Sequence, residues 1–268
     1  MLATHIILAA ADRTPLAPTR ERLRGIVRVL MRVCEQEPLL AFHVSDSHIH
    51  LLVAISRAAA GRLAQRLALA LAPVVGTALD SARFAGVRDQ AHLSNTFEYI
   101  LRNDEKHRIT PDAWRENSAL PDLLGLRVLK STLCTNVRRS LPRIDGTRLL
   151  AMADWPALTP TLRLEGAAAA ASAALALPDL RGRRAPQVEG CRAVANLVPT
   201  ADSRSLQLEL GRARSTVAVL RQQPTPPSLL RALGLQLSLH DARPQPADAS
   251  FPTIGAVQTW AELPRFSR

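Results

Sequence analysis

Apolar and polar positions along the N-terminal half of the chain follow two periods in turn. Apolar runs of strand length are separated by segments in which apolar residues recur at helical spacing. Pro38 ends the first helical segment, and a polar link at 45–47 joins two apolar runs, as in a β-hairpin. The predicted elements are a strand at 2–10, a helix ending near 37, strands at 39–44 and 48–55, a helix at 58–71, a strand at 82–87 and a helix at 89–108.

This order of elements, β-α-β-β-α-β-α, predicts the fold class. It matches the ferredoxin-like split βαβ motif with one extra helix. We therefore expect an α+β domain over residues 1–150, in which helices pack on one face of an antiparallel sheet.

The second half of the chain has a different composition. Residues 163–177 are rich in alanine, which is typical of an exposed helix or a linker, and residues 178–186 place arginines among glycine and proline. These features predict a linker region over 151–185. A smaller α-helical domain is expected over 186–268, with a proline-rich tail.

Three short apolar-periodic segments in that C-terminal domain indicate helices. A break at 211–213 separates the last two, as in a helix-turn-helix. A small helical bundle with a solvated arginine face explains the pattern equally well. In a helix-turn-helix, the side chains offered to DNA would be Arg212, Arg214, Ser215, Thr216 and Arg221.

Composition makes nucleic acid the leading candidate partner. The 268 residues carry a net charge of +11, and nearly all the basic residues are arginines, whose guanidinium groups match phosphate oxygens. A high-GC genome also enriches arginine, so the charge is not decisive. Arg138 and Arg139 could line a surface that binds DNA hairpins, although a run of charge is usually a solvated face.

The cysteines and the hydropathy of the chain favour a cytoplasmic protein. The three cysteines lie far apart and form no metal-ligand pair or disulfide framework. No segment approaches the roughly 20 apolar residues that span a bilayer, and His5 interrupts the apolar start of the chain. We therefore expect a soluble protein of the cytoplasm, associated with the nucleoid and without membrane contact.

A His-x-His pair is the first candidate for chemistry. His48 and His50 stand two apart in a predicted strand, so both imidazoles point to one face. Two imidazoles on one rigid strand can supply two ligands of a divalent metal ion. Taken alone, such a pair is more often structural.

The helix at 89–108 carries the second candidate. Tyr99 is the only tyrosine of the chain and Asn103 follows four residues later, so a phenol and an amide are neighbours on one helix face. Taken alone, this pattern is that of an ordinary amphipathic helix. The candidate auxiliary groups near the same face are His92, Lys106 and His107.

Together the two motifs form a complete set for phosphoryl transfer. A hard divalent cation held by His48, His50 and Asn103 would leave positions open for phosphate oxygens and offset the charge that develops there. The phenol of Tyr99 would attack phosphorus and form a covalent phosphotyrosine.

The same motifs resemble those of the HUH endonuclease superfamily, particularly the single-tyrosine REP-associated tyrosine transposases. Their hairpin reads roughly hydrophobic run, Met-Pro-Asn-His-hydrophobic-His-Leu-Leu, and residues 40–53 here read LAFHVSDSHIHLLV. Their nucleophile helix carries Tyr-x-x-x-Asn, usually followed by proline, and residues 97–104 here read FEYILRND. The resemblance covers roughly residues 1–110.

This resemblance implies cleavage of single-stranded DNA beside hairpins, through a 5′-phosphotyrosine and a free 3′-hydroxyl. It also implies Mg²⁺ or Mn²⁺ at His48, His50 and Asn103. The chain is expected to act as a monomer or a homodimer, and the sequence does not decide between the two. The chain departs from the family in two places, because Ser-Asp-Ser at 45–47 replaces Met-Pro-Asn and Asp104 replaces the proline. These departures indicate a divergent branch.

Two alternative functions share these features. A non-catalytic DNA-binding regulator could keep the fold and use its C-terminal module, although it would have no reason to keep the histidine pair and Tyr99 together. A relaxase or a replication initiator would use the same chemistry. Those enzymes usually have larger cores or additional tyrosines, whereas this chain has one tyrosine.

Overall fold

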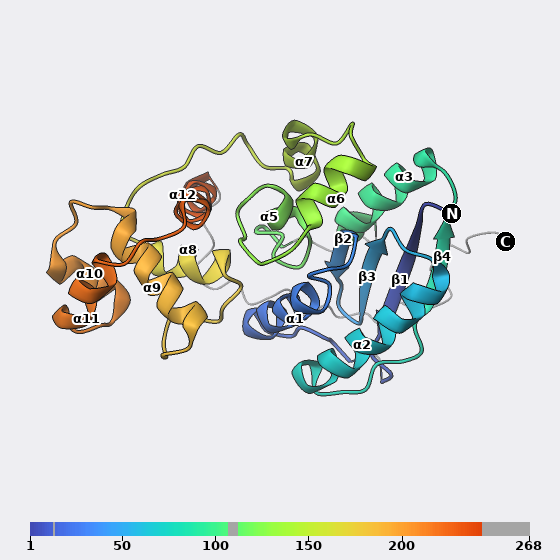
Figure 1. The fold of residues 1–268 in the computed structure, drawn as a ribbon, viewed down its shortest axis with the longest axis horizontal. Helices are drawn as coiled ribbons and strands as arrows, with labels where there is room; N and C mark the ends of the chain where they lie inside the picture. The colour runs from blue at the N-terminus through green and yellow to red at the C-terminus, as the bar shows by residue number, and fades with distance from the viewer. Residues whose placement is uncertain (13, 107–111, 243–268) are drawn as a thin grey trace.

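An antiparallel sheet of four strands lies at one end of the protein, in a computed structural model that describes residues 1–12, 14–106 and 112–242 (Figure 1). The strands are β1 (Ala3–Ala9), β2 (Leu39–Val44), β3 (His48–Val53) and β4 (Arg83–Val87), in the order β2-β3-β1-β4. The helices are α1 (Arg20–Val33), α2 (Arg57–Val75), α3 (Gln90–Leu101), α4 (Asn103–Lys106), α5 (Leu120–Leu123), α6 (Leu133–Ser140), α7 (Gly146–Ala153), α8 (Ala167–Ala174), α9 (Ala185–Leu197), α10 (Ser203–Leu210), α11 (Arg214–Arg221) and α12 (Pro227–Ala242). The predicted α+β class and antiparallel sheet are confirmed.

The register of the sheet sorts its side chains into two faces. Directly opposed residues of an antiparallel pair share a face, and His50 is opposed by Ile7 on β1 and by His43 on β2. Side chains two residues apart on a strand also share a face, which adds His5 and His48. We call this the histidine face. The alternating residues of β1 and β3 on the other side are all apolar except Thr4, and we call that side the apolar face.

Helices cover both faces of the sheet, so the expectation of helices on one face only is wrong. Helices α1 and α2 pack together, and Arg57 of α2 lies over the ring of Phe84 on the apolar face. Helix α3 lies on the histidine face, where Tyr99 contacts the rings of His5 and His50. The reason is burial: β2 is buried along its whole length and β3 nearly so, and both faces therefore need a cover.

Helices α8 to α12 share a second hydrophobic core, and we call them the helical unit. The alanine-rich segment, expected to be a linker or an exposed helix, forms α8 within this core. Ala167, Ala170 and Ala171 are fully buried, and their small side chains let α8 approach α9 and α12 closely. The helical unit therefore begins at α8 rather than at residue 186.

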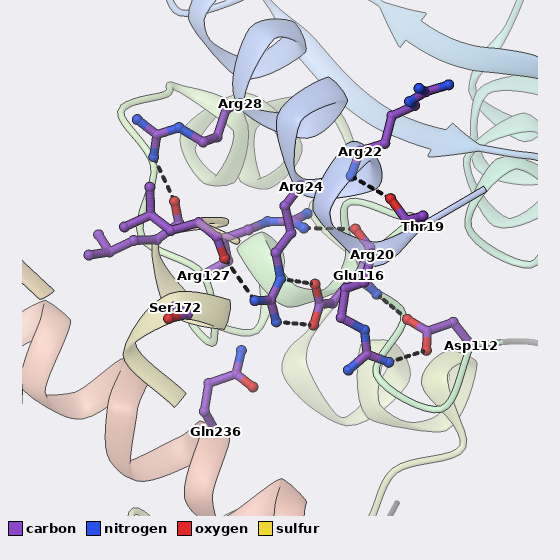
Figure 2. A network of polar contacts seen from close by, with 12 residues as sticks. Thr19, Arg20, Arg22, Arg24, Arg28, Asp112, Glu116, Arg127, Ser172 and Gln236 are labelled. Atoms are coloured by element: carbon purple, nitrogen blue, oxygen red, sulfur yellow. Dashed lines mark hydrogen bonds and ion pairs between the residues drawn. The ribbon is translucent and has the colours of Figure 1, made fainter. Parts of the chain in front are cut away.

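Arginines of α1 join the sheet to the helical unit (Figure 2). Arg24 donates two hydrogen bonds to the Glu116 carboxylate, at 2.6 and 2.7 Å, and a third of 2.8 Å to the Leu177 carbonyl. Arg28 donates to the Leu175 carbonyl at 2.7 Å. Both carbonyls lie just past α8, so the two guanidinium groups meet the negative end of its dipole.

One helix contradicts the expectation that no segment approaches membrane-spanning length. Helix α2, at 19 residues, is long and apolar enough by length and composition alone. Its buried residues recur at helical spacing and include Leu63, Leu67 and Leu71, which belong to the core beneath the sheet. The apolar character of α2 is that of a core helix.

Loss of Arg24 should destabilise the whole chain. Arg24→Met leaves Glu116 buried without its main partner, and removing one member of a buried pair costs about 3–5 kcal/mol of unfolding free energy. Urea denaturation measures the loss. The control is Arg32→Met, which removes an exposed arginine of the same helix.

The double variant Arg24→Met/Glu116→Gln should lose less unfolding free energy than the two single variants lose together, because it leaves no buried charge unpaired. Equal losses of unfolding free energy for Arg24→Met and Arg32→Met would show that Arg24 does not stabilise the fold through these buried contacts.

Candidate active site

The two histidines of β3 stand together on the histidine face. His50 is fully buried and His48 is partly exposed, and their ring centroids lie 4.6 Å apart. The strand presents both because β3 is held on both sides, by β1 and by β2. The predicted shared face of the pair is therefore present in the structure.

Helix α3 brings Tyr99 over the same place. The helix is capped by Asp89, whose side chain accepts a hydrogen bond from the His92 backbone, and it buries Phe97 and Ile100 in the core. These anchors leave Tyr99 half-buried, with its ring edge-on to His50 at a centroid distance of 5.8 Å. Burial raises the pKa of the Tyr99 phenol, and a hydrogen bond with Asn103 opposes that rise.

Asn103 completes the set of predicted residues. The helix predicted over 89–108 is interrupted at Arg102, and Asn103 begins α4, fully buried. Its Nδ2 atom lies 3.2 Å from Nε2 of His50, and its Oδ1 accepts a 2.6 Å hydrogen bond from the Ser45 hydroxyl. The structure thus brings Tyr99 and Asn103 to the buried histidine from a second element.

His5 is a member of the site that sequence reasoning missed. Its Nε2 lies 2.9 Å from Nδ1 of His50, and the two rings stack at 5.1 Å. Burial, together with the nearby charge of His92, lowers the pKa of His5 to about 4, so His5 is neutral at pH 7. A neutral His5 can accept the Nδ1 proton of His50, which would turn the Nε2 lone pair of His50 toward Asn103. The available signal was that His5 interrupts an apolar strand.

A second polar cluster lies beside the first on the histidine face. His43 Nε2 is 2.8 Å from Oδ1 of Asp104, and Asn117 donates to Oδ2 of the same carboxylate at 2.9 Å. Burial alone would raise the pKa of Asp104, but the His43 imidazole and these hydrogen bonds outweigh burial and hold that pKa below its usual value. The cluster fixes the start of α4, and Asn103 with it.

The donor set suits a divalent cation. The 3.2 Å between His50 Nε2 and the Asn103 carboxamide is near the ~3 Å that separates adjacent ligand atoms of an octahedral ion bound at roughly 2.0–2.1 Å. A half-turn of the carboxamide would present Oδ1 to that position and let Nδ2 donate to Ser45. Within the described ranges no three His, Cys, Asp or Glu residues gather as metal ligands, so the third ligand would be this amide.

The remaining predicted residues fall into three groups. His92 is partly exposed on α3, near enough to His5 to lower its pKa. Arg138 and Arg139 are exposed in the last turn of α6. Lys106 ends α4, and His107 lies outside the described residues.

The five residues predicted for a helix-turn-helix have two different environments. Arg214, Ser215 and Thr216 are exposed at the start of α11. Arg212 and Arg221 instead donate to backbone carbonyls of neighbouring segments within the helical unit. The exposed residues remain open to a ligand, whereas the other two hold the fold together.

Comparison with known proteins places the chain in no family. Neither protein-family models, nor curated proteins, nor solved structures give a match.

Ser45→Ala should destabilise the site and the fold. The change removes the hydroxyl that donates to the buried Oδ1 of Asn103, and an unsatisfied buried acceptor costs about 1–3 kcal/mol. The unfolding free energy from urea denaturation gives the cost, and Ser81→Ala at an exposed position is the matched control. If both variants lost the same unfolding free energy, the Ser45 hydroxyl would not hold Asn103 in place.

Proposed function

We propose that the sheet-containing part of the chain is a metal-dependent endonuclease and strand transferase for single-stranded DNA, of the single-tyrosine HUH kind. The observation that carries the proposal is the meeting of His48 and His50 with Tyr99 and Asn103. The two pairs come from different elements, and folding is needed to bring them together. Such convergence of a phenol, two imidazoles and an amide is unusual for a purely structural cluster.

The topology supports the finer fold assignment. The order of elements is β-α-β-β-α-β, and β1 lies between β3 and β4 in the sheet. That arrangement is the one expected of a ferredoxin-like split βαβ fold. An additional helix, α3, then carries the nucleophile across the histidine face, as the HUH resemblance requires.

The proposed reaction exchanges one phosphoester for another. The Tyr99 oxygen attacks phosphorus, a bond forms between the two, and the bond from phosphorus to the DNA 3′-oxygen breaks. The phenol loses a proton and the leaving 3′-oxygen gains one, so a 5′-phosphotyrosine and a 3′-hydroxyl result. A second 3′-hydroxyl can reverse the step and rejoin strands.

The other residues prepare this step. Mg²⁺ or Mn²⁺ held by His48, His50 and Asn103 would polarise the scissile phosphate when bound. His5 orients the ring of His50 by accepting from or donating to its Nδ1. The half-buried position of the phenol limits the access of water to the phosphotyrosine.

Tyr99→Phe should abolish covalent protein–DNA adducts. The chain has no other tyrosine, so no second phenol can replace the nucleophile. The measurement mixes the protein with labelled single-stranded hairpin oligonucleotides and Mg²⁺ or Mn²⁺, and follows the shifted band on a denaturing gel. A chelator should remove the band as well.

His50→Gln should also lose the adduct, whereas His240→Gln, a matched change on α12, should keep it. Adducts in Tyr99→Phe would identify another nucleophile. If the unmodified protein bound hairpins tightly and formed no adduct, the function would be that of a non-catalytic DNA-binding regulator.

The rate of adduct formation should rise with pH. Burial raises the pKa of Tyr99 above its ordinary value near 10, so at pH 7 almost all of the phenol is protonated. The ionised fraction grows about tenfold per pH unit below that pKa. Single-turnover rates between pH 7 and 9, at saturating DNA, test the slope, and a flat profile would mean that deprotonation of Tyr99 does not limit the reaction.

A further inference from the structure

Arginines dominate one stretch of the helical unit. Residues 178–222 contain eight arginines and four acidic residues, and no acidic residue occurs between Glu209 and Asp241. Three of the four acids are engaged by the backbone. Asp179 accepts from the Arg181 amide, Asp202 from amides of α10, and Glu209 from the Ala168 amide. These acids cap turns and helices, and they form no ion pairs with the arginines around them in the described part of the chain.

Arg212 joins two segments of this stretch into one surface. Its guanidinium group donates to the carbonyls of Leu180 at 2.9 Å and Gly182 at 2.6 Å. These hydrogen bonds hold the loop that precedes α9 against the turn between α10 and α11. Gly182 has a φ of +109°, a backbone conformation that glycine adopts without strain. Arg183 and Arg184 continue this loop and are exposed.

Helix α11 adds an exposed face that can approach a groove of duplex DNA. It buries Val217 and Leu220, and it exposes Arg214, Ser215 and Val219 on the side away from the core. Short side chains let a helix come close to base edges, and an exposed apolar group such as Val219 can contact a thymine methyl. Arg221 fixes the helix by donating to the Ala195 and Ala201 carbonyls.

The chemistry of this surface favours paired over unpaired bases. Residues 178–222 contain no aromatic side chain on which an unpaired base could stack. A helix carrying small polar residues, flanked by arginines, is the usual arrangement for a major groove and its phosphates. None of the ion pairs among described residues involves Arg183, Arg184 or Arg214.

We propose that this surface binds duplex DNA. Helix α11 enters the major groove, and Arg183 and Arg184, in the loop that precedes α9, contact backbone phosphates. The inference rests on the proposed function only in taking DNA as the partner. Helices α10 and α11 lie at the opposite end of the molecule from the sheet, so duplex and single strand would be held at separate places (Figure 1). Arg212 and Arg221 are positioning residues that shape the surface without contacting DNA.

The test compares two double variants of the full chain by fluorescence anisotropy with a labelled DNA duplex. Arg183→Ala/Arg184→Ala should weaken binding roughly tenfold or more at 100 mM salt and reduce the slope of log K against log salt by about two, one per lost phosphate contact. Arg32→Ala/Arg62→Ala removes the same charge from exposed positions of α1 and α2 and should change neither quantity. Both double variants alter exposed side chains, and equal thermal unfolding temperatures verify their folding.

Equal losses in the two double variants, or no loss in either, would overturn the proposal. Preference for a single strand of the same sequence, or for an RNA duplex, would overturn the assignment of duplex DNA. Tyr99→Phe should bind duplex normally. Duplex binding that depends on the loop arginines, in a protein that forms no covalent adduct, would leave this inference standing while the nuclease proposal failed.

Discussion

Four histidines share one face of an otherwise apolar sheet, and each buried ring nitrogen needs a partner, because water cannot reach it. The histidine face meets most of this requirement through contacts between its own histidines and with side chains of α4, while Nδ1 of His43 has no hydrogen-bond partner among the described residues. His50 contacts His5 on the neighbouring strand and Asn103 on α4, and His43 contacts Asp104. Helix α3 must therefore end where it does, so that the first two residues of α4 reach the sheet.

A second constraint acts between the sheet and the helical unit. Arg24 is buried with Glu116, and it also closes the carbonyl end of α8, so a single side chain ties a helix of the first core to a helix of the second. Burial would raise the pKa of Glu116, but the hydrogen bonds and charge of Arg24 hold it below the usual value, which keeps the pair ionised. Arg24 therefore links the two cores directly through the Leu177 carbonyl, and Leu235 and Leu239 of α12 add apolar contacts within the first core.

The sequence predicted the local elements well because each leaves a periodic pattern. Apolar runs marked the strands, and the spacing of two placed His48 and His50 on one face. Contacts between distant residues leave no such pattern. His5 and His50 are 45 positions apart and Arg24 and Glu116 are 92 apart, so neither pair could be read from local spacing. The prediction for the segment that forms α8 was wrong for a different reason. A run of alanines has no distinct polar face, so its sequence does not show which side of the helix is buried.

The two departures from the HUH motifs that the sequence resembles have one physical explanation. In the HUH endonucleases that the sequence resembles, a proline usually follows the asparagine and restricts the backbone there. Here Asp104 occupies that position and bonds to His43, while Ser45, in the altered hairpin turn, bonds to Asn103. Two side-chain hydrogen bonds thus fix the asparagine where a rigid backbone would otherwise do so. The departures are coupled, since each anchors one of two adjacent residues to the same end of β2, and with both in place Asn103 still lies beside His50.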